Sequence, residues 1–261
     1  MANCKPCNSP IAVKPSLSPD SHLPFGQPEL YRSIVGALQY LTITRPDLSL
    51  LVNQACKHMH APIVGQFASI KRLLQFVQGT LTHGLTFSPS SFDLQAFCNS
   101  NWVGTVLDRR STSGYCVYLG SNLISWSAKK QPTVSRSSTE AEYRSLVHTA
   151  AELTWLQMLL RELHIPSSIA PILWCDNLLA IALASNPVFH TRSKHIEVDC
   201  HFICEKVARK QILLRYVLLI SLQSLSLCLG SNTFKPSFWS LHLPSACRRV
   251  IRQPQQHQLQ L

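Results

Sequence analysis

Two acidic residues occur where a nuclease that uses two metal ions would place them. Asp176 follows the apolar stretch Pro171–Cys175, at the carboxyl end of an expected strand, and Glu142 lies near the start of an expected helix. In such enzymes, carboxylates from different elements hold two Mg²⁺ ions about 4 Å apart, which activate a water molecule and stabilise the leaving oxygen. Carboxylate oxygens are hard ligands that suit Mg²⁺. We therefore treat Glu142 and Asp176 as candidate catalytic and metal-binding residues.

Both acids also have purely structural interpretations. Asp is a favourable N-cap, so Asp176 could cap a helix that begins at Asn177. Thr139 as N-cap, with Glu142 three residues later, would form a capping box. The spacing of the residues leaves these alternatives open.

A third acid is missing from the position where the same chemistry needs one. The strand expected over Asp93–Cys98 should end in a carboxylate, but it is followed by Asn99 and, two residues later, Asn101. An amide is neutral and does not supply the charge that holds Mg²⁺. Asn99 therefore leaves this strand end without the carboxylate that a metal site would need.

Two further clusters of ligand-type residues have simpler explanations. Cys4 and Cys7 have the spacing of half a zinc site, but no second Cys/His pair follows nearby, so we do not expect zinc there. In the segment Lys194–His201, the acids and histidines fall at i, i+4 spacing. Such pairs usually form a solvated, salt-bridged helix face.

The hydrophobic pattern divides the chain into a helical part and a mixed part. Residues 28–82 show helical spacing, including Tyr31, Ile34, Leu38 and Leu41, with breaks such as Pro46. From residue 93 onward, short apolar strands, a hairpin signal and a long helix alternate. The expected strands are Asp93–Cys98, Gly114–Leu119, Leu123–Ser127, Pro171–Cys175 and Gln211–Val217, and the expected helices are Glu140–Leu163, Asn177–Ser185 and Ile196–Lys210. This order predicts an α/β fold with a mixed sheet and flanking helices.

Both ends of the chain differ from this pattern. Residues 1–26 carry repeated prolines among Ser and Asn, which predicts an extended linker. Residues 218–261 contain no Asp or Glu, and we expect an irregular, disordered tail. The apolar stretch Tyr216–Leu229 is shorter than the roughly 20 residues that a membrane helix needs. No apolar signal sequence opens the chain, so we expect an intracellular protein without a membrane partner.

The charge balance favours a polyanionic partner. The chain has 24 Lys and Arg against 13 Asp and Glu, which gives a net charge of +11. Such a balance favours nucleic acid over a small-molecule substrate, through attraction that weakens with salt. The basic residues that we expect to contact the nucleic-acid backbone are Lys129, Lys130, Arg136, Arg192 and Lys194.

Several long motifs resemble one known family, the Pol polyproteins of copia-type retrotransposons. The segments Tyr31–Leu41, Thr44–Leu48 and Lys71–Thr80 resemble the end of the reverse transcriptase in these polyproteins. Five further segments resemble the RNase H domain that follows the polymerase in these polyproteins. They are Arg109–Leu119, Ile124–Gln131, Ser135–Tyr143, Cys175–Asn177 and Lys194–Ile196. The resemblance covers about residues 1–217. It implies a reverse transcriptase end at 27–90 and an incomplete RNase H-like domain at 91–217.

The resemblance also implies an ancestral activity and its residues. The family's RNase H domain cleaves RNA–DNA hybrids with Mg²⁺ or Mn²⁺ held by four carboxylates. Glu142 and Asp176 match two of them, and Asn99 stands where the first belongs. The fourth should follow the strand that ends near Val217, where its motif is absent. We expect a frameshift after Val217 to explain this, and the missing Tyr-x-Asp-Asp motif excludes polymerisation by this chain.

Three functional hypotheses follow from these observations. The first is an active RNA–DNA hybrid ribonuclease, which the loss of two of the four acids argues against. The second is a non-catalytic module that binds nucleic acid, which the charge supports. The third is a non-functional product of a decayed element. We expect a catalytically inactive RNase H-like domain.

Overall fold

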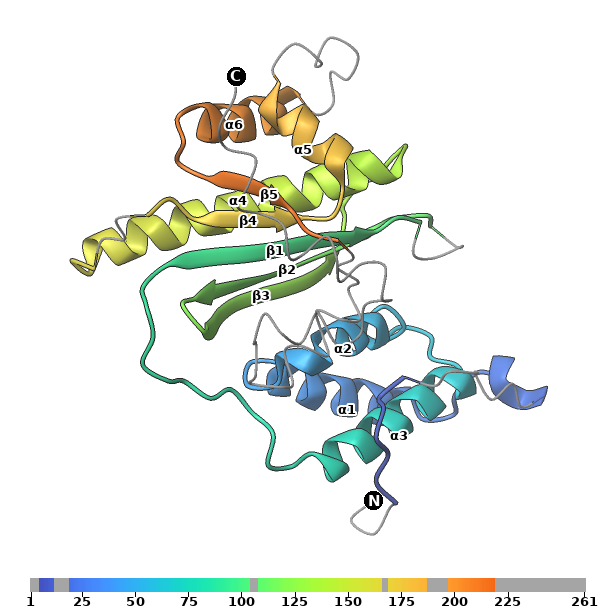
Figure 1. The fold of residues 1–261 in the computed structure, drawn as a ribbon. Helices are drawn as coiled ribbons and strands as arrows, with labels where there is room; N and C mark the ends of the chain where they lie inside the picture. Colours follow the sequence, from blue (N-terminus) through green and yellow to red (C-terminus); the bar gives the residue numbers. More distant parts are fainter. Residues whose placement is uncertain (1–4, 12–18, 104–107, 166–168, 187–196, 219–261) are drawn as a thin grey trace, which may run out of the picture.

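The computed structural model describes residues 5–11, 19–103, 108–165, 169–186 and 197–218, with the side chains of 197–200 excepted (Figure 1). The N-terminal part is helical. Its helices are α1 (Pro28–Leu41), α2 (Ser49–Cys56) and α3 (Val64–Gly79), with short 3-10 helices η1 (Pro19–His22) and η2 (Pro46–Leu48). Pro28 occupies the first turn of α1, where the missing N–H is not needed. The sequence patterning predicted this helical segment.

The three helices bury one shared apolar core. Tyr31, Val35 and Leu38 lie on the inner face of α1 and pack with Leu48 and Val52. Part of the predicted linker joins this unit, because Phe25 stacks on Phe67 of α3 with ring centroids 4.0 Å apart.

A buried ion pair closes the turn between α1 and α2. The Arg45 guanidinium donates two hydrogen bonds to the Asp47 carboxylate, at 2.9 and 2.7 Å. It also donates to the backbone carbonyl of Thr80 at 2.8 Å, just after α3. Arg45 and Asp47 are both less than 10% exposed. Residues of the Thr44–Leu48 motif therefore hold the ends of the helices together.

The second part of the chain forms a five-stranded mixed sheet in the order β3-β2-β1-β4-β5. Its strands are β1 (Leu94–Asn101), β2 (Thr112–Leu119), β3 (Asn122–Lys130), β4 (Ile172–Cys175) and β5 (Leu213–Tyr216). Strands β1, β2 and β3 pair antiparallel, whereas β4 runs parallel to β1 and β5 parallel to β4. The predicted α/β fold with a mixed sheet and flanking helices is confirmed.

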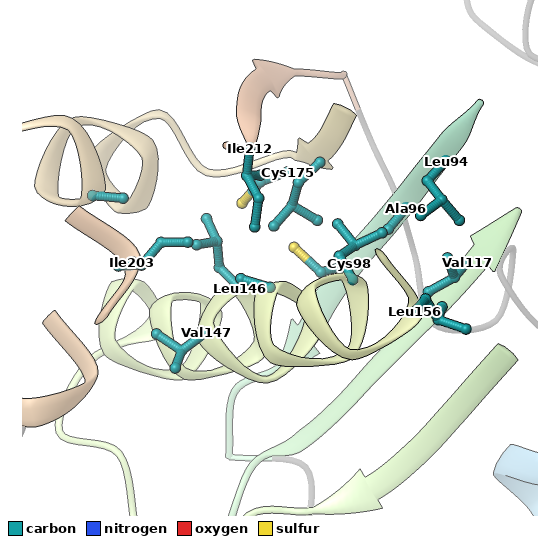
Figure 2. Packing of buried hydrophobic residues seen from close by; sticks show 14 of the residues in the cluster. Leu94, Ala96, Cys98, Val117, Leu146, Val147, Leu156, Cys175, Ile203 and Ile212 are labelled. Carbon is teal, nitrogen blue, oxygen red and sulfur yellow. The ribbon is translucent and has the colours of Figure 1, made fainter. Parts of the chain in front are cut away.

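One face of the sheet is covered by the long helix α4 (Ser138–Glu162), with α5 (Leu178–Ser185) and α6 (Glu197–Ala208) beside it (Figure 1). Leu146 and Leu153 of α4 pack on Ala96 and Cys98 of β1 in the main apolar core, part of which Figure 2 shows. The helix has 25 residues, about 37 Å at 1.5 Å per residue. It therefore spans the sheet and brings its first turns to the ends of β1 and β4.

The opposite face of the sheet is covered by the helical unit. Leu50 of α2 is buried in a second apolar cluster with Phe97, Cys116, Tyr118 and Leu123 of the sheet. The Asn53 side chain donates a hydrogen bond to the backbone carbonyl of Ala128 in β3 at 2.8 Å. Figure 1 shows α1, α2 and α3 on this side and α4 on the other. The two parts of the chain thus share one apolar interface.

Several element boundaries differ from the sequence expectation. Strand β1 continues to Asn101 instead of ending at Cys98, and β3 continues to Lys130. Pairing with β2 explains the longer β1, because Asn99, Ser100 and Asn101 face Gly114, Ser113 and Thr112. Strand β5 is shorter than predicted. Within the described residues, no helix is both long enough and apolar enough to cross a membrane.

Candidate active site

The candidate acids meet where three elements converge. The parallel strands β1 and β4 place Asn99 and Asp176 at the same edge of the sheet, and the second turn of α4 places Glu142 beside them. Asn99 and Glu142 are only 7% and 6% exposed, whereas Asp176 is partly exposed. The structure therefore brings all three sequence-predicted positions into one centre, open to solvent on the side of Asp176.

Asn99 is bonded directly to one of the two remaining acids. Its side-chain Nδ2 donates a hydrogen bond to Oδ2 of Asp176 at 2.9 Å. An aspartate at this position would set two carboxylates against each other, which is unfavourable unless a cation or a proton lies between them. The amide replaces that repulsion with an attractive contact.

Glu142 does not take part in a capping box. Helix α4 begins at Ser138, with Ser137 as its N-cap accepting a hydrogen bond from the Glu140 backbone N–H at 3.1 Å. The interpretation with Thr139 as cap was wrong by two residues. Glu142 instead points to β1, where Oε1 accepts a hydrogen bond from the Ser100 backbone N–H at 2.8 Å. Its other oxygen, Oε2, is buried and has no hydrogen-bond partner within the described part of the chain.

Burial dominates the acid–base behaviour of Glu142. Desolvation raises the pKa of this carboxyl to about 9, although the Ser100 backbone hydrogen bond lowers it, and the nearby Asp176 adds a smaller increase. Without a cation, the Glu142 carboxyl is therefore protonated at neutral pH.

Asp176 is not a helix cap either. The N-cap of α5 is Asn177, whose side-chain Oδ1 accepts a hydrogen bond from the Ala180 backbone N–H at 3.0 Å. The N-cap interpretation of Asp176 was therefore wrong, because the neighbouring amide has that role. The Asp176 carboxylate is left facing Asn99 at the strand edge.

Sequence reasoning missed two cysteines in this centre. Cys175 ends β4 and Cys98 lies in β1, and both are buried free thiols. Figure 2 shows their side chains on the α4 side of the sheet. The hydrogen bond between the two thiols raises the pKa of Cys98 and lowers that of Cys175. The signal was the position of Cys175, directly before Asp176 at the end of a buried strand.

A buried polar network holds the start of α4 against the sheet. The Ser145 hydroxyl donates to the backbone carbonyl of Asn99 at 2.9 Å. The Gln131 side-chain amide donates to the Ser113 hydroxyl at 2.7 Å and to the Ala141 carbonyl at 2.9 Å. The Ser135 hydroxyl in turn donates to Oε1 of Gln131 at 2.6 Å. These contacts position Glu142, and their polar residues were not singled out from the sequence.

The predicted nucleic-acid contacts divide into three groups. Lys129 and Arg136 are exposed, near the end of β3 and just before α4. Lys130 forms an ion pair with Asp108, so part of its charge is offset locally. Arg192 and Lys194 lie outside the described residues, as do His195 and the side chains of Glu197 and Asp199.

The centre does not fit a pair of Mg²⁺ ions. Glu142 and Asp176 supply two carboxylates, but the neutral Asn99 amide, which donates a hydrogen bond to Oδ2 of Asp176, adds no negative charge to hold a second cation. Among the described residues, the third ligand-type side chain is a sulfur, since single ligand atoms of Glu142, Cys175 and Asp176 all lie within 4.8 Å of one another. Thiolate is a soft ligand and does not suit Mg²⁺.

The strand order, the parallel β1–β4 pair and the long helix that carries Glu142 define an RNase H-like domain. No family model matches the sequence. The chain is 47% identical over 208 residues to the retrovirus-related Pol polyprotein from transposon RE2 of Arabidopsis thaliana, covering 79% of this chain and 14% of that protein. It is 33% identical over 214 residues to the corresponding polyprotein from transposon TNT 1-94 of Nicotiana tabacum, covering 79% and 16%. The chain is therefore homologous to a segment of the Pol polyproteins of copia-type retrotransposons.

The chain spans about a seventh of the length of these polyproteins. Among solved structures, LC11-RNase H1, isolated from compost by a metagenomic approach, is 15% identical with a TM-score of 0.38. This likeness covers 53% of this chain and 92% of that one. The strand order, and not this distant likeness, defines the fold.

Proposed function

We propose that this RNase H-like domain derives from a metal-dependent ribonuclease that cleaved RNA–DNA hybrids within a Pol polyprotein, and that this chain no longer cleaves them. The ancestral chemistry would use Mg²⁺ or Mn²⁺ as its cofactor. In this proposal residues 27–90 correspond to the end of the reverse transcriptase and 91–217 to the RNase H-like domain. The buried interface between α2 and the sheet supports their common origin as one folded unit.

One observation carries the proposed loss of activity. The hydrogen bond from the Asn99 amide to Oδ2 of Asp176 takes the place of a carboxylate pair with a cation between them. Charge stabilisation by bound metal supplies several kcal/mol to phosphodiester hydrolysis, and each 1.36 kcal/mol corresponds to about a tenfold change in rate. A centre that no longer holds two cations is therefore expected to be slower by several orders of magnitude.

The direct test is cleavage of an end-labelled RNA–DNA hybrid by the purified chain in Mg²⁺ and in Mn²⁺. Glu142→Gln serves as the control, because Gln keeps the acceptor for the Ser100 N–H while removing the metal-binding charge. We expect the same background signal from both proteins, when circular dichroism shows that both are folded. Cleavage by the wild-type chain that the control lacks would overturn the proposal.

A second candidate function is nucleic-acid binding without catalysis. It is supported by the net charge of +11 and by Lys129 and Arg136, which are both exposed, near the end of β3 and just before α4. Lysine and arginine contacts to phosphates give affinity that falls steeply with salt, without reading sequence. We infer a weak, salt-dependent affinity for RNA–DNA hybrids and other polyanionic duplexes.

Fluorescence anisotropy at several salt concentrations tests this second function. The double variant Lys129→Gln/Arg136→Gln is compared with Lys71→Gln/Arg161→Gln, which removes the same charge from exposed positions on α3 and α4. Loss of each phosphate contact should reduce the slope of log affinity against log salt by about one unit. Equal slopes for the two double variants would exclude Lys129 and Arg136 as the binding surface.

A further inference from the structure

The candidate centre contains a sulfur ligand that the ancestral chemistry does not use. Cys175 is buried at the end of β4, directly before Asp176, and opposite Glu142 of α4. Ligand atoms of these three residues all lie within 4.8 Å of one another. In a tetrahedral site with bonds of about 2.0 to 2.3 Å, neighbouring ligand atoms are roughly 3.5 Å apart. A contraction of about 1 Å would therefore bring the three side chains to a common cation.

A second observation indicates that the cluster is built to receive a ligand. The side-chain oxygen Oε2 of Glu142 is buried and has no hydrogen-bond partner among the residues that the structure describes, while Oε1 is fixed by the Ser100 backbone N–H at 2.8 Å. Glu142 as a whole is only 6% exposed. A buried polar atom without a partner costs about 1–3 kcal/mol, so its retention needs an explanation. A cation held between Glu142 and Cys175 would supply the missing partner.

The mixed donor set determines which cations are suitable. Mg²⁺ requires an octahedral shell of oxygen ligands, whereas Zn²⁺ and its spectroscopic substitutes Co²⁺ and Cd²⁺ accept thiolate together with carboxylate. Replacement of an aspartate by Asn99 lowers the negative charge of the centre, which suits one cation better than two. Because Asp176 is partly exposed, water can reach a fourth coordination position from that side.

We propose that Cys175, Glu142 and Asp176 form a binding site for one thiophilic divalent cation, such as Zn²⁺, at the position of the ancestral Mg²⁺ centre. Binding releases two protons to solvent, one from the Cys175 thiol and one from the Glu142 carboxyl, leaving thiolate and carboxylate ligands. The proposal rests on the proposed loss of the two-Mg²⁺ centre, because it uses the same two carboxylates, whereas its test measures cation binding without a cleavage assay. Cys98 is not counted as a ligand, because it lies outside the group of ligand atoms that converge within 4.8 Å.

Titration of the full chain with Co²⁺ and Cd²⁺ under reducing conditions tests this site by optical absorption. Cys4 and Cys7 are first replaced by serine, because they could bind a soft metal themselves. In this background we expect a thiolate-to-metal charge-transfer band that saturates at one equivalent and that excess Mg²⁺ does not remove. Zn²⁺ should displace Co²⁺ and abolish its visible bands, since Zn²⁺ has a filled d shell.

Two matched cysteine variants assign the band to a residue. Cys175→Ser should abolish the band, whereas Cys98→Ser makes the same change in the adjacent buried thiol and should retain it. A third variant, Glu142→Gln, keeps the hydrogen bond to the Ser100 N–H but removes the carboxylate. It should weaken cation affinity by about tenfold or more. Circular dichroism and the thermal transition establish that each variant is folded.

Several results would overturn the proposal. A charge-transfer band that is lost on replacing Cys4 and Cys7 would assign the metal to the N-terminal cysteines. A charge-transfer band that survives Cys175→Ser would assign the metal to another thiol, and loss of that band in Cys98→Ser would identify the thiol as Cys98. Unchanged affinity in folded Glu142→Gln would exclude the Glu142 carboxylate as a ligand. If Cys175→Ser fails to fold, the Glu142→Gln affinity alone decides the outcome.

Discussion

The Ser100 backbone N–H donates a hydrogen bond to Oε1 of Glu142 at 2.8 Å and thereby joins β1 to the second turn of α4. This contact fixes the glutamate at the end of the strand, and its second oxygen is buried without a partner in the described ranges of the chain. The same residue thus has a structural contact and an unsatisfied atom, and both have measurable consequences.

The first prediction concerns the pH dependence of stability. The pKa of Glu142 is raised from 4.5 to about 9 by burial, so between these values the folded chain retains a proton that the unfolded chain releases. The contribution of Glu142 to the free energy of unfolding is therefore fully present below pH 4.5. It is lost as the pH rises toward 9, by at most about 1.4 kcal/mol per pH unit.

Glu142→Gln should remove this dependence. Denaturant unfolding of both proteins at several pH values isolates the contribution as a difference, because other titrating groups remain the same. We expect the free energy of unfolding of the variant to rise steadily relative to that of the wild type from pH 5 to pH 8. A constant difference across that range would show that Glu142 is ionised in the folded chain.

The second prediction tests the contact between Asn99 and Asp176. Asn99→Asp removes the amide donor and places a carboxylate about 3 Å from another. Without divalent cations we expect a loss of about 1–3 kcal/mol in the free energy of unfolding at neutral pH. Asn101→Asp adds the same charge at the exposed end of β1 and should change stability by less than about 0.5 kcal/mol. Equal effects of the two variants would mean that local repulsion at Asp176 is not important.

The third prediction concerns the interface between the helical unit and the sheet. Leu50 is 7% exposed and packs with Phe97, Cys116 and Tyr118. Leu50→Ala should destabilise the chain by about 2–4 kcal/mol in chemical denaturation, through lost burial and a residual cavity. Leu30→Ala changes a leucine of α1 that is 43% exposed and serves as the control. A similar small effect for both variants would mean that α2 does not pack on the sheet in solution.

The fourth prediction concerns the buried Arg45–Asp47 pair. Asp47→Ala leaves the Arg45 guanidinium buried with only the Thr80 acceptors, and removing one partner of a buried pair costs about 3–5 kcal/mol. In contrast, Glu205→Ala breaks an exposed pair with Arg209 and should cost less than about 1 kcal/mol. Thermal unfolding compares the two variants. Comparable losses would show that the Arg45 pair is solvated.

The order of strands and helices could be predicted because the periodicity changes sharply near residue 93. The burial of both faces of the sheet could also be predicted from the sequence. Ala96, Phe97 and Cys98 are apolar in succession and not in alternation, which is typical of a strand buried on both faces. That α2 provides the second cover was not predictable. The contact joins Asn53 to Ala128, 75 residues away, and no local pattern encodes such a pairing.

The candidate centre was predictable in its positions but not in its contacts. Residue types located Asn99, Glu142 and Asp176, and the structure brings them together. The cap of α4 was misassigned because Ser137, Ser138 and Thr139 are all suitable N-caps. Local preference does not decide among them, whereas the long-range contact from Glu142 to Ser100 selects a helix that begins at Ser138.

The most direct test of the central claim is the thermal stability of the wild-type chain as Mg²⁺ is added. A ligand that binds the folded state alone raises the unfolding temperature as its concentration exceeds its dissociation constant. Because Asn99 has replaced a charge that two Mg²⁺ ions require, we predict no rise at millimolar Mg²⁺ beyond that of Glu142→Gln. A saturable increase in the wild-type chain that Glu142→Gln lacks would show that the centre still binds Mg²⁺ and would contradict the account.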